Sequence, residues 1–292
     1  MNKRVKKHSR KTIGDYVIFA ILTLLAFSLV FPFYNAVVIS LETATAYVQN
    51  PMSLYPKDMT FENYMYLIED GSVWVGYRST LTIVFWGLIF GMSITTLTAY
   101  GLSRRDFPGK KPLFLLMMFT MFFGGGMVPT YLMMKDFKLI NTFAGVILLG
   151  GVSTSNIIVM KSGFESSPPA LEEAAKIDGA NDLQIFWQVM LPLQKPLLAT
   201  FSLFTIVRYW NSWYWPMLLL NTPDKMTLQL VLRMIVMNAS EEVSASAGAS
   251  DQMFSIGLKM AAVMFTIVPV MCVYPFLQKH FAKGVMVGAI KM

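Results

Sequence analysis

The chain has 292 residues, of which 55% are hydrophobic and 14% are charged, and its formal net charge is +7. Soluble domains usually carry about 25% charged residues, so this composition excludes an ordinary soluble protein and predicts a membrane protein. The single cysteine, Cys272, excludes an internal disulfide bond, and neither histidine has neighbours at metal-ligand spacing, so no metal site is expected.

Six apolar segments are long enough to cross a bilayer, because a transmembrane helix needs about 20 mostly apolar residues. They cover residues 16–40, 77–102, 112–134, 142–160, 197–220 and 254–277. The sequence therefore predicts an all-α integral membrane protein with one six-helix domain, residues 16–278, between an N-terminal tail, 1–15, and a C-terminal tail, 279–292. The glycine run 124–126 in the third segment could be a hinge or a close helix contact, and packing is favoured because small residues are common where membrane helices meet.

Basic residues set the expected orientation, since loops on the cytoplasmic side of a membrane carry an excess of lysine and arginine. Basic residues gather in the first 11 positions, in the loops after the second and fourth segments, and near the end of the chain. Both termini are therefore expected on the cytoplasmic side of the membrane. The positive charge is then a signal of topology, and nucleic acid is not an expected partner. Of the two long outer loops, 42–75 and 221–253, the second could hold a short interfacial or re-entrant helix.

The loop between the fourth and fifth segments, residues 161–196, carries strong helix signals. Ser167 is a suitable N-cap, and Pro168 suits the first helical position. Glu172 and Lys176 are spaced to pair on one helix face, and Gly179 is expected to end the helix in a left-handed conformation. These residues predict a short helix followed by a sharp turn.

A second helix is expected directly after this turn. Either Asn181 or Asp182 can cap it, and it should run to Met190 and end before Pro192 and Pro196. Composition alone also allows an ordinary amphipathic loop, but two rigid helices could transmit a push from a soluble partner. Four apolar residues at helical spacing are expected to hold the second helix against the membrane domain: Leu183, Phe186, Trp187 and Met190.

The spacing within this loop resembles the EAA loop of ATP-binding-cassette importer permeases. Glu173-Ala174-Ala175 is followed by Gly179 and then by an apolar-x-Leu-Pro end at residues 189–192, with valine where isoleucine is usual. The whole chain, including residues 278–291, is similar to the second permease subunit of maltose-type carbohydrate importers. The runs 124–131 and 208–216 look closer to a branch that handles complex oligosaccharides.

This resemblance implies the type I importer permease fold with a cytoplasmic coupling helix, in the inner membrane of a bacterium. It also implies a set of partners: a second homologous permease subunit, two cytoplasmic ATP-binding subunits, an extracytoplasmic solute-binding protein and a carbohydrate substrate. The chain has no glycine-rich phosphate-binding loop, so ATP and Mg are expected on the partner subunits, with no cofactor and no catalytic residue on this chain. The residues that the resemblance assigns to coupling are Glu172, Glu173, Ala174, Ala175, Asp178, Gly179 and Pro192.

A polar and aromatic run at residues 208–216 is the candidate substrate path. Sugars offer hydroxyl groups to polar side chains and flat C–H faces to aromatic rings, but the run could equally be an aromatic belt at the membrane surface. Arg208 could bind a polar or anionic substrate or brace the bundle, with bracing slightly favoured. Trp210, Trp213 and Tyr214 are expected to share one helix face. The candidates are Arg208, Tyr209, Trp210, Asn211, Trp213 and Tyr214.

The resemblance therefore predicts a non-enzymatic importer subunit that forms half of the path for an oligosaccharide, which could be acidic. The alternative is an ATP-independent secondary transporter or a membrane enzyme. Such a protein needs an acidic relay or a catalytic cluster within the membrane. No Asp or Glu lies well inside a predicted span, which counts against this alternative.

Overall fold

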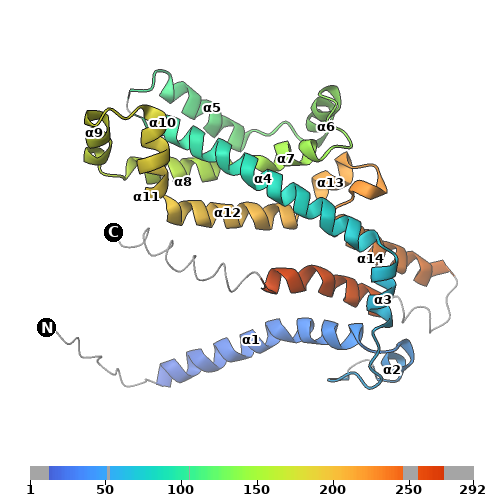
Figure 1. Ribbon diagram of the computed structural model, residues 1–292. Helices are drawn as coiled ribbons and strands as arrows, with labels where there is room; N and C mark the ends of the chain where they lie inside the picture. The colour runs from blue at the N-terminus through green and yellow to red at the C-terminus, as the bar shows by residue number, and fades with distance from the viewer. Residues whose placement is uncertain (1–12, 51–52, 105, 246–255, 273–292) are drawn as a thin grey trace. The chain divides into compact units, whose positions relative to one another are not determined.

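A computed structural model describes residues 13–50, 53–104, 106–245 and 256–272 of the chain (Figure 1). These residues form helices joined by short connections, with no strand among them, and this confirms the predicted all-α fold. The chain divides into two compact units. The first comprises Met1–Tyr66 and Val236–Phe265, and the second comprises Leu67–Ile235 and Thr266–Met292.

The first unit contains α1 (Ile13–Ser40), α2 (Ala44–Gln49) and most of α3 (Glu62–Glu69). Asn63 and Tyr64 of α3 hold the end of α1, since Asn63 Nδ2 donates to Ser40 O over 3.1 Å and Ser40 Oγ lies 2.7 Å from Tyr64 Oη. The helix Ile256–Cys272 starts against the same asparagine, because a Cβ added at Gly257 would lie 2.7 Å from Asn63 Nδ2. The predicted outer loop 42–75 therefore contains helical structure.

The second unit carries the helices that surround the candidate site. The helix α14 fills part of the predicted outer loop 221–253, where the sequence allowed a short interfacial or re-entrant helix. The elements are α4 (Ser72–Ser103), α5 (Lys110–Phe122), α6 (Met127–Asp136), α7 (Phe143–Gly151), α8 (Thr154–Glu165), α9 (Pro169–Ile177), α10 (Asp182–Gln184), the π-helical η1 (Ile185–Met190), α11 (Leu191–Leu193), α12 (Lys195–Trp210), α13 (Tyr214–Leu219), the 3-10 turn η2 (Pro223–Lys225) and α14 (Leu228–Ala245).

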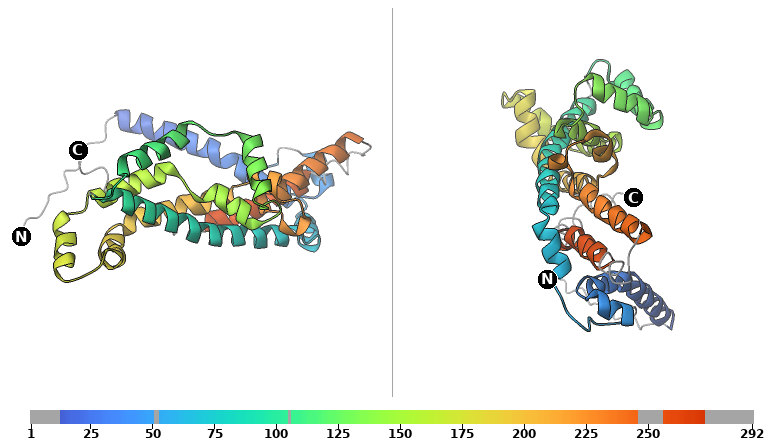
Figure 2. Two further views of the ribbon diagram at one scale, coloured as in Figure 1. Left: turned by 90° about the horizontal axis from the view of Figure 1, so that it is seen from above. Right: turned by 90° about the vertical axis from the view of Figure 1, so that its right-hand side faces the viewer.

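Helix α4 is the axis of the second unit, and α7, α8 and α12 pack along it. The approach to α7 is close, since a Cβ added at Gly91 would lie 2.5 Å from the carbonyl oxygen of Gly151. Figures 1 and 2 show α9 at one end of α4 and α13 at the other. A single long helix therefore links the two regions that the sequence marks as functional.

Only α1 and α4 are single helices long and apolar enough to cross a membrane among the described residues. Three bent pairs raise the number of possible spans to five: α5 with α6 at 118°, α7 with α8 at 52°, and residues 182–193 with α12 at 81°. The predicted third and fourth segments, 112–134 and 142–160, therefore each contain a bend, and the bend at Gln194 lies just before the predicted fifth segment, 197–220. The described part of the predicted sixth span is the shorter apolar helix Ile256–Cys272.

The break between α5 and α6 falls at the glycine run 124–126. Gly126 has a φ of +81°, a left-handed value that glycine adopts without steric cost. A Cβ added at Gly124 or Gly126 would meet no atom within 4 Å in the described structure. Among the described residues these glycines therefore form a bend between α5 and α6 and no close helix contact.

Candidate functional site

Helix α9 begins one residue later than the sequence suggested. Its N-cap is Pro168, which offers no side-chain acceptor, and not Ser167. The hydroxyl of Ser167 instead accepts a hydrogen bond from Gln194 Nε2 at 3.1 Å, and the same nitrogen donates to Gly163 O at 2.9 Å. The buried amide of Gln194 thus fixes the start of the loop to the bend before α12.

The C-terminal end of α9 has the geometry expected from Gly179. Its φ is +81°, Gly179 N donates to Lys176 O over 3.1 Å, and Ala180 N donates to Ala175 O over 3.0 Å. This pair of bonds is a Schellman motif, which satisfies the free carbonyl groups at a helix end. The prediction that Gly179 ends the helix in a left-handed conformation is confirmed.

Asn181, rather than Asp182, caps the next helical segment. Gln184 N donates to Asn181 Oδ1 over 2.9 Å, and Asn181 N donates to Gln184 Oε1 over 2.9 Å, which completes a capping box. The predicted end before Pro192 is wrong, because helical structure continues through this proline to Leu193. The six π-helical residues of η1 change the hydrogen-bond register just before the proline, which has no N–H to donate.

Two of the four apolar residues expected to anchor this segment do so. Phe186 and Met190 are buried among Tyr100, Phe164 and Phe201, whereas Leu183 and Trp187 are 66% and 62% exposed. A π-helix closes its hydrogen bonds over five residues and so has more residues per turn than an α-helix, and a periodicity of 3.6 residues therefore does not hold all four side chains on one face. The anchoring prediction is therefore correct for the first pair and wrong for the second.

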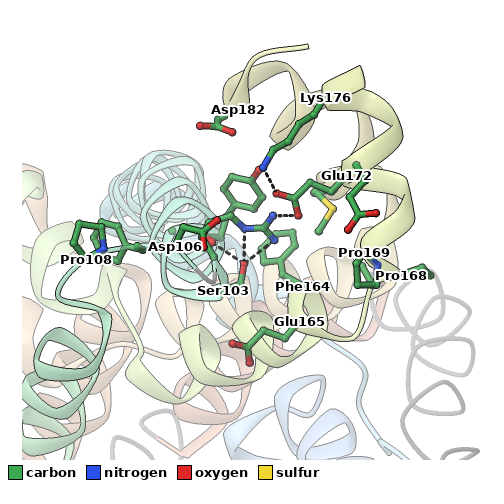
Figure 3. Close-up of a pocket in the computed structure, with 17 residues that line it drawn as sticks. Ser103, Asp106, Pro108, Phe164, Glu165, Pro168, Pro169, Glu172, Lys176 and Asp182 are labelled. Carbon is green, nitrogen blue, oxygen red and sulfur yellow. Dashed lines mark hydrogen bonds and ion pairs between the residues drawn. The ribbon is translucent and has the colours of Figure 1, made fainter. Parts of the chain in front are cut away.

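A pocket of about 660 Å³ lies between α9 and the C-terminal end of α4 (Figure 3). Its walls include Tyr100, Ser103 and Arg104 on one side and Glu172 and Lys176 on the other. Glu172 lies between Lys176, at 3.3 Å, and the guanidinium group of Arg104, to which it is directly hydrogen-bonded. The predicted pairing of Glu172 with Lys176 is confirmed, and the partnership with Arg104 was not predicted.

The electrostatics of this pocket favour an ionised Glu172. Partial burial raises the pKa of its carboxyl group, but the hydrogen bonds and positive charges of Arg104 and Lys176 outweigh burial and hold the pKa below its usual value. A second ion-pair group lies beside the first. Glu165 binds Lys161 at 2.7 Å and Lys110 at 3.0 Å, which joins the end of α8 to the start of α5.

The other residues assigned to coupling lie on the outer surface of the loop. Ala175 packs partly against the aromatic cluster below it, so the two alanines of the motif face different surroundings. The face that remains open is small in side-chain volume and carries negative charge. The exposed members are Glu173, Ala174, Asp178, Gly179 and Pro192.

The candidate substrate path is not one helical face. Helix α12 ends at Trp210 with Asn211 as its C-cap, and α13 starts only at Tyr214 after Trp213. The expectation that Trp210, Trp213 and Tyr214 share a face is therefore wrong. Pro216 cannot donate to a preceding carbonyl, which explains why the run does not continue as one helix.

Arg208 and Trp210 each carry a polar atom that has no partner within the part of the chain that the structure describes. Arg208 Nε and Trp210 Nε1 are buried, and neither has a hydrogen-bond partner among the described residues. Trp210 packs on the ring of Tyr77 with centroids 6.2 Å apart, and beyond the break the guanidinium of Arg233 lies 4.3 Å from the ring centre of Trp213. Arg233 is a further candidate for the substrate path. Sequence reasoning did not identify it because it lies on α14, outside the run 208–216.

Tyr209 and Asn211 differ from these two residues. Tyr209 is buried, and its hydroxyl donates to Ile147 O at 2.7 Å, so this side chain belongs to the packing of α12 against α7. Asn211 and Tyr214 are exposed. Of the six candidates, Arg208 and Trp210 are the ones with unused hydrogen-bonding groups at buried atoms.

Comparisons with known proteins agree with this picture. Residues 112–287 match the family model described as "Binding-protein-dependent transport system inner membrane component". The chain is 37% identical to the polygalacturonan/rhamnogalacturonan transport system permease protein YtcP of Bacillus subtilis, over 97% of this chain and 99% of that protein. It is 27% identical to the arabinooligosaccharides transport system permease protein AraQ of Halalkalibacterium halodurans, over 91% and 93% of the two chains.

A solved structure has the same fold. One chain of a bacterial ABC transporter involved in the import of the acidic polysaccharide alginate superposes with a TM-score of 0.82. The two chains share 29% sequence identity, and the match covers 94% of this chain and 99% of the other.

Proposed function

Because the chain belongs to the family of binding-protein-dependent transport system inner membrane components, we propose that it is the permease subunit of an ATP-binding-cassette importer for oligosaccharides. In this proposal it forms half of the translocation path, and a second homologous permease forms the other half. Two cytoplasmic ATP-binding subunits bind ATP and Mg, and an extracytoplasmic solute-binding protein delivers the substrate. This chain forms part of the transport path and catalyses no reaction.

The observation that carries the proposal is the construction of the α9 loop. A Schellman motif closes α9, and a capping box opens the next segment two residues later, so the corner between them is rigid. Buried Phe186 and Met190 seat the loop on the membrane domain. A rigid corner with an open acidic and alanine-rich face suits the transfer of movement from an ATP-binding subunit.

The distribution of charge supports a cytoplasmic location for this loop. Arg104, Lys110, Lys161 and Lys176 all lie at the α9 end of the second unit, where they pair with Glu165 and Glu172. An excess of basic residues marks the cytoplasmic side of a membrane protein. We therefore orient the α9 end toward the cytoplasm. The basic residues in the first 11 positions and near the end of the chain favour the same side of the membrane for both termini.

The substrate that fits best is an acidic oligosaccharide. Arg208 and Arg233 place guanidinium groups beside aromatic rings near the end of α4 opposite to α9. Guanidinium groups bind carboxylates, and aromatic rings pack on the C–H faces of sugars. Relatives named for polygalacturonan/rhamnogalacturonan and alginate transport support the same substrate class.

The test is the purification of the tagged chain from its native membrane. We expect an ATPase and a second permease to copurify, and we expect loaded binding protein to stimulate ATP hydrolysis. Glu173→Arg and Gly179→Pro should abolish the stimulation, whereas Asp136→Arg, a charge reversal at the exposed end of α6, should leave it unchanged. Isolation without an ATPase, or full stimulation in both loop variants, would contradict the proposal.

A further inference from the structure

The end of helix α4 is bound to α9 through one side chain. Arg104 is the C-cap residue of α4, and its Nη1 donates to Glu172 of α9. Its Nε and Nη2 donate to Ser103 Oγ at 3.2 and 3.1 Å, so the guanidinium group is held from both sides. A planar group with this many directed bonds has one orientation, unlike the flexible ammonium group of a lysine.

The pocket between α4 and α9 surrounds the contact of Arg104 with Glu172. Residues of α4 and of α9 line its opposite walls, so the space between the two helices is not filled by packed side chains. The hydrogen-bonded pair of Arg104 and Glu172 crosses it, and Lys176 supports the carboxylate from the far side. Movement of α9 toward or away from α4 therefore acts directly on the guanidinium group.

The guanidinium group also rests on a rigid aromatic cluster. Its central carbon lies 4.3 Å from the ring centre of Tyr100, one turn earlier on α4. The Tyr100 ring contacts Phe186 of η1 with centroids 4.9 Å apart and Phe164 of α8 with centroids 5.6 Å apart. Phe164 and Phe186 are each 1% exposed, so the cluster is tightly packed and resists deformation.

At its other end, α4 is joined to the start of α14. Leu228 N donates to Thr80 Oγ1 at 2.9 Å, and a Cβ added at Gly76 would lie 2.8 Å from the Leu228 Cα. Five residues after Leu228 on α14, Arg233 covers the ring of Trp213. A shift of α4 along its axis would therefore reach the candidate substrate residues.

We propose that Arg104 is a positioning residue that transmits movement of helix α9 to helix α4 and so couples ATP hydrolysis to the translocation path. This inference rests on the proposed function. It assigns the transmission to an arginine outside the EAA-like run, and it requires a contact within one chain rather than a contact with the ATP-binding subunit.

The test measures ATP hydrolysis and transport by the purified complex in proteoliposomes. Arg104→Gln should leave assembly and basal ATPase activity intact and reduce the stimulation by loaded binding protein about tenfold, within the usual range of coupling energies. Glu172→Gln should reduce the stimulation by a similar factor. The triple variant Arg104→Glu/Glu172→Arg/Lys176→Glu, which reverses all three charges of the group, should recover most of the stimulation. A residue that only supports folding would change the yield of complex and not the ratio of stimulated to basal activity.

The matched control is Lys110→Gln, which removes a positive charge at the same end of the molecule. Lys110 pairs with Glu165 of α8 and not with α9, so its loss should leave the stimulation unchanged. Wild-type stimulation in both single variants would overturn the role of Arg104 while leaving the proposed function intact. Absence of an ATPase in the wild-type preparation would overturn the proposed function itself.

Discussion

The ring of Tyr209 fills the space beside Gly87, so that a Cβ added at this glycine would lie 2.4 Å from Tyr209 Cε2. The same ring lies against Gly150, where an added Cβ would be 2.6 Å from Cε1. The hydroxyl group completes the contact by donating to Ile147 O. Helices α4, α7 and α12 therefore meet around one tyrosine, and two glycines make room for it.

Gly87→Ala should destabilise the second unit. The added methyl group has no space unless Tyr209 or the helices move, and overpacking of this kind costs about 1–3 kcal/mol. Gly101→Ala is the matched control on the same helix, because a Cβ there meets nothing within 4 Å. Thermal unfolding of the purified protein should show a lower midpoint for the first variant only, and equal midpoints would contradict the packing role of Tyr209.

Tyr209→Phe separates packing from substrate binding. The variant keeps the ring and loses the hydrogen bond to Ile147 O, so we expect a loss of stability of about 1 kcal/mol. The transport rate of the assembled complex should stay at the wild-type value, because the hydroxyl is already used within the protein. A selective loss of transport at unchanged stability would indicate that the Tyr209 hydroxyl takes part in substrate binding.

Arg208→Gln should change substrate preference. Hydrogen bonds to charged groups are worth about 1.5–3 kcal/mol, so uptake of an acidic oligosaccharide should fall about tenfold or more while uptake of a neutral one of equal length changes little. Arg78→Gln, which removes an exposed charge from α4, serves as the control. An equal loss for both substrates would indicate that Arg208 braces the bundle.

The local signals of the α9 loop were readable from the sequence, and the long-range partners were not. Gly179 and Asn181 act through bonds to residues within five positions, so their neighbours in the chain determine their geometry. Arg104 and Glu172 are 68 positions apart in the chain, and no pattern in the sequence predicts their hydrogen bond.

The continuous apolar runs of the sequence also gave helix ends that differ from those in the structure. Hydropathy measures the preference for a bilayer, and it does not register a left-handed glycine such as Gly126 or the buried amide of Gln194. Gly126 marks a bend within the predicted third span, and Gln194 marks a bend just before the predicted fifth span. The substrate-path residues were identified as a run, but the break after Trp210 separates them into two helices, and Arg233 enters from a third.

The ion pair at Glu172 should show a defined pH dependence. Because its folded-state pKa lies below the ordinary value of 4.5, the pair contributes stability above that pH and loses it as pH falls through the lowered pKa. Wild type should therefore be more stable than Glu172→Gln by a constant amount, about 1 kcal/mol or less, at neutral and mildly acidic pH. The difference should shrink below pH 4.5. A difference that grows on acidification would mean that burial dominates and that the pKa is raised.

Asn141 joins the connection before α7 to the segment after α13. Its Oδ1 accepts from Asn221 N at 3.2 Å and Thr222 Oγ1 at 3.0 Å, while its carbonyl oxygen accepts from Lys225 Nζ at 2.9 Å. Its φ of +57° lies in the left-handed region, which asparagine tolerates better than alanine.

Two substitutions divide these roles of Asn141. Asn141→Gly loses the side-chain bonds and keeps the backbone conformation, whereas Asn141→Ala loses the bonds and strains the backbone as well. We expect the glycine variant to lose about 1–2 kcal/mol of unfolding free energy from the side-chain bonds, and the alanine variant to lose about 1 kcal/mol more from the backbone. Chemical denaturation in detergent measures both values. If the two variants were equally stable, the left-handed conformation would contribute nothing, and the side-chain bonds alone would account for asparagine at this position.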